Sequence, residues 1–410
     1  MTQVCNHAIS GFIDAYINDN NICFVDGNSG AFYKYSINSN ILTLNTLLYA
    51  NNQCLRILPR RIINYEECLY FISNNGYIIY KGKFINDSIV VELVCEYPTT
   101  PSIKIKDAFL IDGKIWCIPA SLSQKIMIFD VKNEKYIPFD LYSELKRCNI
   151  TVENFNIMTI KYVDKSFFFT LETGTELIKY NVESRSVIKY EIPDKLQVSG
   201  FDYDGKYFWL RSKYGVCLYR WALNEDNIIT YCLDDINESE KGECNAKVVL
   251  SSNGKVILIP TYCNSVIYLD QNENCLKRVN GLENIRHVKG KENYTFSIGN
   301  AEINGKLILY PWAGEQLISI DLTDMKAETH RLTINEEDFE KLQILYWRTK
   351  QLVYETEENT LSTLLNRLAH PLMDEFKLQD SQKKYEKNAG KEIYNLTAKG
   401  QKSFRTKLNH

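Results

Sequence analysis

The side chains that could do chemistry are scattered along this chain of 410 residues. Its five histidines show neither HxH nor HExxH spacing, so no metal motif can be read from them; they are His7, His287, His330, His370 and His410. The patterns GxGxxG, GxxxxGK[ST], GxSxG and DxDxDG are all missing, which removes the readable nucleotide, α/β-hydrolase and calcium-loop signatures. We therefore expect no metal and no cofactor, and the sequence names no catalytic residue.

The twelve cysteines are dispersed singly and form no CxxC pair; Cys23, Cys68, Cys117, Cys217 and Cys263 are typical. Most of them stand among Ile, Tyr and Phe, where a thiol acts as a small hydrophobic group. The start "MTQVCNHAISGF" lacks the pattern of a secretory signal. We therefore expect nearly all twelve thiols to be free, in a cytoplasmic protein.

Charge and composition narrow the class of partner. A net charge of −3 is too close to zero to favour nucleic acid or an anionic membrane, and no apolar run approaches the ~20 residues of a membrane span. The abundance of Ile, Asn, Lys and Tyr resembles the codon bias of an AT-rich genome, which points to a bacterial source.

The elements that must position these side chains come from a repeated phrase. Seven copies can be aligned, and each contains an apolar strand bounded by turns; the aligned positions are Asp26, Ser73, Pro119, Leu171, Arg211, Pro260 and Pro311, which lie 40 to 52 residues apart. The apolar strands are expected to start near Ile22, Leu69, Ile115, Phe167, Tyr207, Val256 and Leu307. This period indicates a repeat architecture.

Each copy has the same local pattern. Four of the apolar strands follow Asp-Gly-Lys or Asn-Gly-Lys, at residues 112–114, 204–206, 253–255 and 304–306, and Asp-Gly and Asn-Gly favour tight hairpin turns. In three copies the strand ends at a proline, which has no N–H to extend a ladder. In five copies a polar side chain able to cap the next turn stands ten or eleven residues after the aligned position; these residues are Ser36, Asp130, Asn181, Asp270 and Asp321.

Adding the segment before each turn gives four strands per repeat, which is the make-up of a propeller blade. We predict an all-β fold, a seven-bladed β-propeller, with six or eight blades as the alternatives, and no helical periodicity over residues 9 to 335. The repeats resemble kelch-like propellers in architecture. The paired glycines of kelch blades and the Trp-Asp ending of WD40 blades are absent, so the resemblance implies no partner.

The chain is expected to divide into a propeller at 1–336, a hairpin and docking helix at 337–376, and a basic helical or partly disordered tail at 377–410. Leu361, Leu364, Leu365 and Leu368 fall on one helical face, between a capping Asn359 and Pro371. The tail carries nine Lys and Arg against three Asp and Glu, so it has a charge of +6 and the body −9. The tail could fold back, bind an acidic partner or keep the end soluble.

The loops after the aligned positions should gather at one end of the disc. They carry the residues that we expect to bind a partner: Arg211, Tyr214, Tyr262, Trp312, Glu172 and Glu315. Tyr, Trp and Arg are enriched at binding hot spots; the alternative is that these aromatic side chains cap their own blades.

Two function classes follow. The first is a non-catalytic interaction module that binds a protein, peptide or glycan through one face of the disc, as a monomer or in a hetero-complex. The second is a propeller lyase or hydrolase with a dispersed, metal-assisted or metal-free site at the central channel. Virginiamycin lyase-like propellers show that the second is feasible, although their Gly-Pro-Asp-Gly and Trp-Phe-Thr phrases are missing here. Converging histidine and carboxylate side chains at the axis would favour the enzyme.

Overall fold

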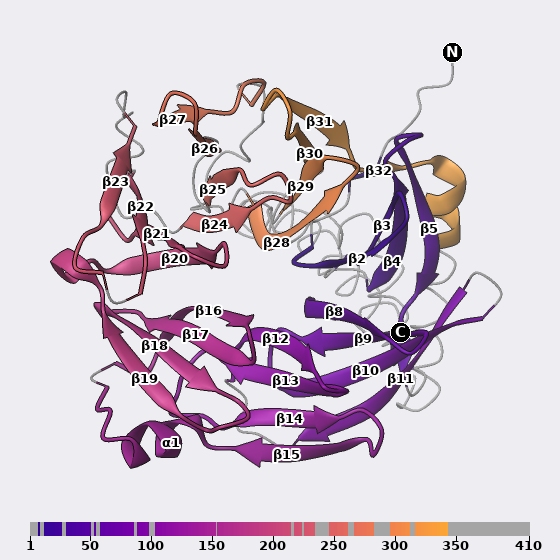
Figure 1. Ribbon diagram of the computed structural model, residues 1–410. Helices are drawn as coiled ribbons and strands as arrows, with labels where there is room; N and C mark the ends of the chain where they lie inside the picture. Colours follow the sequence, from indigo (N-terminus) through magenta and orange to yellow (C-terminus); the bar gives the residue numbers. More distant parts are fainter. Residues whose placement is uncertain are drawn as a thin grey trace, which may run out of the picture. The chain divides into compact units, whose positions relative to one another are not determined.

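The computed structural model describes residues 7–8, 12–26, 30–50, 53–54, 58–85, 88–97, 103–152, 154–214, 217–223, 225–233, 246–260, 266–282, 296–311 and 316–342. These residues form seven four-stranded antiparallel sheets arranged as the blades of a β-propeller, as predicted (Figure 1). The predicted docking helix and tail, and the part of the 337–376 segment that follows residue 342, lie outside the described residues.

Each blade is a simple meander of four consecutive strands. The first four blades consist of β2 (Ala15–Asn18), β3 (Asn21–Val25), β4 (Ala31–Ser36) and β5 (Ile41–Leu47); β8 (Pro59–Tyr65), β9 (Cys68–Ser73), β10 (Tyr77–Ile85) and β11 (Ser88–Tyr97); β12 (Ile105–Ile111), β13 (Lys114–Pro119), β14 (Ile126–Asp130) and β15 (Lys135–Phe139); and β16 (Ile157–Val163), β17 (Ser166–Leu171), β18 (Glu176–Asn181) and β19 (Val187–Glu191). The last three consist of β20 (Val198–Tyr203), β21 (Phe208–Ser212), β22 (Cys217–Trp221) and β23 (Ile229–Cys232); β24 (Ala246–Leu250), β25 (Val256–Pro260), β26 (Ile267–Asp270) and β27 (Cys275–Arg278); and β28 (Phe296–Ile303), β29 (Lys306–Pro311), β30 (Gln316–Asp321) and β31 (Ala327–Arg331).

The seven predicted apolar strands are the second strands of the blades, and every predicted start is within one residue of the observed one. They are apolar throughout because a neighbouring blade covers each of their faces. In β17, for example, Phe167 and Phe169 pack toward the third blade while Phe168 packs toward the fifth. The core therefore consists of apolar layers between consecutive blades, and most of the large exposed aliphatic residues stand on outermost strands, such as Ile137 in β15 and Ile188 in β19.

The turns follow the predicted chemistry at several positions. Asp112–Gly113 and Asn304–Gly305 have positive φ at both residues, as a type I′ turn requires. The Asp130 carboxylate accepts hydrogen bonds from the backbone N–H groups of Lys132 and Asn133, 3.1 Å each, and the Asn181 side chain does the same for the next turn in its blade. These side chains hold the hairpins at the outer edge of each blade.

Two short helices interrupt the strand pattern, which corrects the expectation of none before residue 335. Helix α1 (Leu141–Arg147) links the third and fourth blades, is capped by Asp140 and buries Leu141 and Leu145 between them. A 3₁₀ turn, Pro193–Lys195, follows the fourth blade. Seven residues are too few to show the helical period on which the prediction relied.

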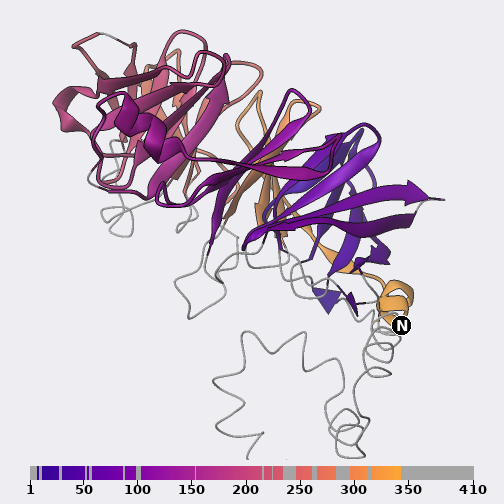
Figure 2. The same ribbon diagram turned by 90° about the horizontal axis from the view of Figure 1, so that it is seen from below.

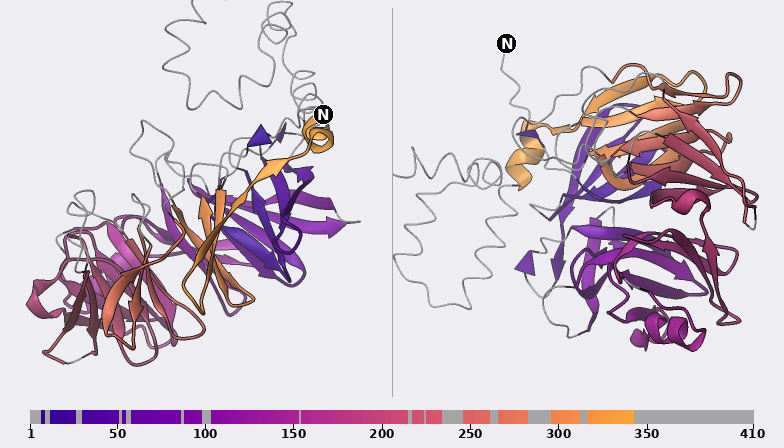
Figure 3. Two further views of the ribbon diagram at one scale, coloured as in Figure 1. Left: turned by 90° about the horizontal axis from the view of Figure 1, so that it is seen from above. Right: turned by 90° about the vertical axis from the view of Figure 1, so that its left-hand side faces the viewer.

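Two segments that belong to no blade close the ring between the seventh and the first blade. Strand β1 (His7–Ala8) pairs with β32 (Thr333–Ile334), which follows the last blade. A helix at residues 336–342 then lies beside the first blade (Figure 3), where the buried Asp338 carboxylate accepts a hydrogen bond from Leu44 N, 3.0 Å away. Both chain segments thus join blade seven to blade one.

Two hairpins lie at the periphery of the propeller. The short hairpin of β6 (Tyr49–Ala50) and β7 (Gln53–Cys54) follows the first blade. The long hairpin of β10 and β11 extends outward from the ring (Figure 2) and exposes Phe84, Ile85 and Val90. No helix in the described part of the chain is long and apolar enough to cross a membrane.

Candidate functional site

The aligned positions of the sequence define one end of the disc, which we call the loop end. Strands β9, β13 and β17 finish there, at Ser73, Pro119 and Leu171. Because first and second strands run antiparallel, the first strand of each blade begins at the same end: Pro59 pairs with Ser73, and Ile105 with Pro119. The opposite end carries the Asp-Gly and Asn-Gly turns, and we call it the turn end.

The structure brings part of the predicted binding set to the loop end. Tyr214 is exposed there, with 58% of its surface accessible. Glu172 is partly exposed one blade away, and its carboxylate accepts a hydrogen bond from Asn156 Nδ2, 2.9 Å away. Tyr262, Trp312 and Glu315 lie outside the described residues.

Arg211 was expected on the exposed surface and is instead 1% exposed. It lies on β21, a second strand whose two faces are covered by neighbouring blades, and its Nη1 donates to Ser212 O at 2.8 Å. The same strand position that made Arg211 part of the repeat alignment therefore removes it from the surface.

Sequence reasoning missed a set of charged residues on the innermost strands, around the axis of the propeller. Each stands in or directly before a first strand of a blade; the set is Asp14, Arg60, Arg61, Lys106, Asp107, Lys161, Asp202 and Lys247. The available signal was charge inside otherwise apolar strands, as in "PRRIINY", "IKDAFLI" and "AKVVL". Buried charge is rare without a partner, so these positions required an explanation.

A recurring irregularity brings several of these residues to the loop end. In five first strands the register shifts near the start; the shifts are at Pro59/Arg61, Ile105/Asp107, Ile157/Thr159, Val198/Gly200 and Phe296/Asn300. Such a bulge adds a residue to one strand and redirects its side chain. Arg60 and Lys106 are the extra residues of the second and third blades.

The best-connected group is Arg61 with two carboxylates. Its Nε donates to Asp107 Oδ1 at 2.5 Å and its Nη2 to Asp107 Oδ2 at 3.0 Å, while Nη1 lies 3.6 Å from Asp14 Oδ1. Burial acts to raise the pKa of Asp107, but the charge and hydrogen bonds of Arg61, with the Arg60 charge and the Ala108 N–H, together outweigh it, so the pKa is lowered. The pKa of Asp14 is raised because burial dominates, although Ile62 N also donates to it at 2.9 Å.

Further along the axis, Lys161 Nζ lies 3.1 Å from Asp202 Oδ2, which also accepts from Leu250 N at 3.1 Å. The ion pair joins the fourth and fifth blades, and the bond from Leu250 adds the sixth. The carboxylates of Asp14, Asp107 and Asp202 are therefore all engaged by a cation and by a backbone N–H.

Of the three other axial cations, Arg60, Lys106 and Lys247, two donate to neutral groups. Arg60 Nε donates to Lys106 O at 2.7 Å, and Lys247 Nζ donates to Asn300 Oδ1. Burial lowers the pKa of Arg60 to about 10. Burial, with repulsion from Arg60, lowers the pKa of Lys106 to about 8. Burial, with repulsion from Lys161, lowers the pKa of Lys247 to about 7.

These axial side chains still contact water. The accessible fraction of the side chain is 27% for Arg61, 13% for Asp107 and 30% for Lys161. Groups that are surrounded by protein and also reach solvent can be reached by a small ligand or by one group of a larger ligand. The axis thus offers fixed cations and carboxylates, which suit the binding of a polar or charged group.

One buried hydroxyl belongs to the same region. Tyr310, on β29, is fully buried, and its hydroxyl has no hydrogen-bond partner among the described residues. Burial raises the pKa of Tyr310 well above its ordinary value, and the Asp14 carboxylate adds to the rise. Gly299 packs against the Tyr310 ring, where a Cβ would lie 2.8 Å from Cδ2.

The axis shows no histidine among its described residues. His330, the histidine whose side chain is described, lies on an outer strand, between Ser319 Oγ at 2.7 Å and Asn40 Oδ1 at 2.9 Å. Within the described ranges, no three His, Cys, Asp or Glu side chains are grouped so as to hold a metal ion.

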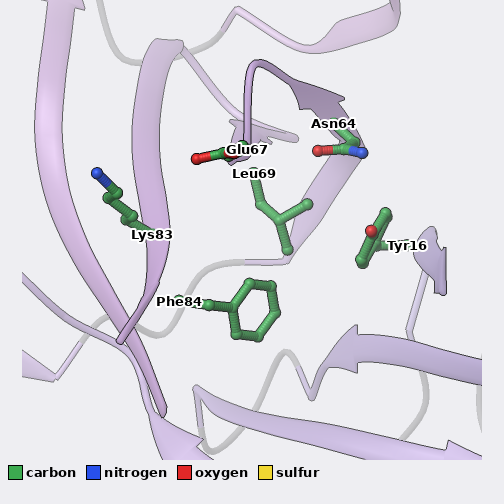
Figure 4. A pocket seen from close by; sticks show the side chains of 6 residues that line it. All are labelled: Tyr16, Asn64, Glu67, Leu69, Lys83 and Phe84. Carbon is green, nitrogen blue, oxygen red and sulfur yellow. The ribbon is translucent and has the colours of Figure 1, made fainter. Parts of the chain in front are cut away.

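A pocket of about 470 Å³ lies elsewhere, between the first two blades at the turn end (Figure 4). It is lined by Tyr16, Asn64, Glu67, Leu69, Lys83 and Phe84. Figure 4 shows the apolar side chains of Leu69 and Phe84 between Lys83 and Tyr16. Of these residues the sequence alignment singled out only Leu69, as the start of a strand, and the pocket is separate from the axial charges.

The cysteine prediction is wrong for one pair. Cys217 and Cys232 are register partners on β22 and β23, with 4.4 Å between their Cα atoms, and they form a disulfide. The two cysteines face each other because of the register of the hairpin, which their spacing in the sequence does not reveal. Six cysteines in the described chain are free: Cys23, Cys68, Cys95, Cys117, Cys148 and Cys275.

Comparison with known proteins supports the fold. No family model matches the chain, and no curated protein matches its sequence. Virginiamycin B lyase from Staphylococcus aureus is similar in structure, with a TM-score of 0.50, 11% identity, and coverage of 76% of this chain and 96% of that one. A streptogramin B lyase gives a TM-score of 0.51 at 12% identity, covering 76% of this chain and 95% of that one.

A catalytically inactive histidine-to-alanine variant of the S. aureus lyase, solved with quinupristin, gives a TM-score of 0.50 at 10% identity, covering 76% of this chain and 97% of that one. At such identities the likeness establishes the propeller fold alone. The chain described here is a seven-bladed β-propeller.

Proposed function

We propose that the protein is a non-catalytic binding module that engages a protein, peptide or glycan at the loop end of the propeller. One observation carries the proposal: the axial cations Arg60 and Lys106 stand at the same end of the disc as the exposed Tyr214 and the partly exposed Glu172. A ring of loops over a charged centre gives a ligand both contact area and a polar anchor.

The kind of partner follows from the distribution of charge. The axial cations alternate with carboxylates and are confined to the innermost strands, whereas nucleic acid requires an extended basic surface. We propose a monomeric propeller or one that assembles with a different protein, without nucleic acid or membrane as a partner.

The proposal is tested with the double variant Tyr214→Ala, Tyr262→Ala. We expect at least tenfold weaker binding, about 1.4 kcal/mol, to a ligand selected from peptide and glycan arrays, because the variant removes the exposed Tyr214 ring and the Tyr262 ring that the sequence alignment assigns to the next loop. The melting temperature should hardly change, since Tyr214 is exposed. Ile188→Ala, on the outer edge of the fourth blade, is the matched control and should bind normally. Unchanged affinity in a folded double variant would contradict the loop-end site.

A catalytic site at the axis is the second candidate, a lyase or hydrolase, and one observation favours it. The lowered pKa of Lys247, about 7, is a suitable value for a general base. If the array ligand is converted by the protein and Lys247→Met abolishes the conversion without weakening binding, the catalytic alternative replaces the binding module.

We also propose a cytoplasmic location. Its support is the set of six free thiols, and in a reducing compartment Cys217 and Cys232 would stand as a dithiol. Rapid alkylation of the protein in intact cells, followed by mass spectrometry, should find both residues alkylated. A quantitative disulfide there would contradict this location.

A further inference from the structure

We propose that Arg60 and Lys106 bind an oxyanion, a carboxylate or phosphate group, of the ligand at the loop end. The inference deepens the proposed function and rests on it, because it names the chemistry of the group that enters the axis.

Geometry places the two cations together. Each is the extra residue of a bulge, Arg60 between Pro59 and Arg61 and Lys106 between Ile105 and Asp107. Arg60 Nε bonds to the backbone oxygen of Lys106 at 2.7 Å, so adjoining blades hold the guanidinium close to the Lys106 backbone. This bond fixes the guanidinium by one edge. The two Nη groups remain to donate to a ligand, and guanidinium N–H groups match the spacing of oxyanion oxygens.

The local charges leave these two cations without direct neutralisation. Arg61 is shared by Asp107 and Asp14, and Lys161 pairs with Asp202. In the described part of the chain no carboxylate lies within 4.0 Å of the Arg60 guanidinium or the Lys106 ammonium group. Asp107 acts on both cations only over longer distances, as do Asp14 on Arg60 and Glu172 on Lys106. Two partly buried cations of adjoining strands repel each other, and a bound oxyanion would remove that repulsion.

One buried hydroxyl interacts with the same group of charges. The Tyr310 hydroxyl is completely buried and has no acceptor among the residues that the structure describes. It interacts electrostatically with both Asp14 and Arg61, so it belongs to the same charged centre. Because its oxygen has no accessible surface, this hydroxyl adds to the charged centre but does not itself contact a ligand in the axis.

The test uses the purified full chain in low-salt chloride buffer. Inorganic phosphate and citrate are titrated separately by isothermal calorimetry, and an Asp- and Glu-rich peptide forms a third arm. We expect saturable binding of at least one small anion, weakened at least tenfold in Arg60→Gln, Lys106→Gln. The matched control is Lys132→Gln, on an exposed turn, and it should bind like the parent protein. Binding only of the acidic peptide, with the same dependence on Arg60 and Lys106, would identify a side-chain carboxylate of a protein as the source.

The melting curve of each variant shows whether it is folded. If the double variant unfolds, the single variant Lys106→Gln is tested in its place. Absence of saturable binding in all three arms, or equal affinity in the folded double variant, would overturn the inference. These failures are distinguishable from failure of the proposed function. A ligand that binds through Tyr214 and Tyr262 but ignores Arg60 and Lys106 leaves the binding module intact and removes only its anion specificity.

Discussion

At the scale of single residues, the axis combines two solutions to the cost of burying charge. Arg61 is satisfied by a bidentate carboxylate and a second carboxylate. Lys247 is bonded to the neutral Asn300 side chain and stands near Lys161 and Arg61. The first arrangement stabilises the charged form, whereas the second disfavours it, which explains the opposite directions in which the pKa values of Arg61 and Lys247 move.

The lowered pKa of Lys247 has a consequence for stability. Its folded pKa is about 7, and the unfolded chain should keep the ordinary value near 10.4. Between these values the unfolded state binds the extra proton, so raising the pH favours the folded state, by at most about 1.4 kcal/mol per pH unit. Lys106, with a folded pKa of about 8, acts in the same direction.

We therefore expect the free energy of unfolding of the parent protein to rise from pH 7 to pH 9 relative to that of Lys247→Met. Urea unfolding of both proteins at each pH measures the difference, in which contributions of thiols and other shared groups cancel. Parallel pH profiles would show that Lys247 is as readily protonated as an exposed lysine.

At the scale of elements, close backbone approach fixes where a first strand can lie. A Cβ on Gly299 would stand 2.1 Å from Ile13 O and 2.8 Å from Tyr310 Cδ2. The missing side chain thus allows β28 of the last blade to approach the segment before β2 of the first. Phe12 stacks on Phe24 and contacts Tyr310 in the same place, with ring centroids 3.9 and 4.9 Å apart.

Gly299→Ala should therefore destabilise the fold by about 2 kcal/mol, in the range of ~1–3 kcal/mol known for overpacked cores. Gly174→Ala is the control, since its Cβ would first meet the flexible Glu176 carboxylate at 3.3 Å. Thermal unfolding of both variants should show a clear loss only for Gly299→Ala. Equal melting temperatures would mean that the first strand can shift outward without cost.

At the scale of the molecule, blades one and seven are joined by segments from the beginning and the end of the described chain. The β1–β32 pair and the helix at 336–342 supply this closure. Within the helix, Asp338 is 3% exposed and accepts from Leu44 N, while its own N–H donates to Asn335 Oδ1 at 2.7 Å. A single carboxylate therefore ties the helix to the outermost strand of blade one.

Asp338→Ala leaves the Leu44 N–H without its acceptor, so we expect a loss of about 1–3 kcal/mol in the free energy of unfolding. Glu337→Ala is the matched control, because Glu337 is exposed and pairs only with Lys341 among the described residues. Hydrogen exchange at Leu44 should accelerate in the first variant alone. If the Leu44 amide stays protected in Asp338→Ala, another group must close the ring.

Sequence by itself determined the number of blades and the position of each second strand. These strands are buried on both faces, so an apolar run such as the three phenylalanines at residues 167 to 169 recurs between turn residues in every copy and can be aligned. It also determined the Asp112–Gly113 and Asn304–Gly305 turns, because few residue types accept positive φ. The turns at Glu66–Glu67 and Asp164–Lys165 adopt positive φ without glycine, so the residue types at these positions do not predict them.

Only the tertiary structure decided which side chains meet. The partners Arg61 and Asp107 are 46 residues apart and belong to adjoining blades, so their pairing depends on how bulged first strands face one another around the axis. Cys217 and Cys232 meet through hairpin register, and Arg211 is hidden because the next blade covers its strand. A local pattern reports whether a strand is buried, but contacts between repeats depend on the closure of the ring.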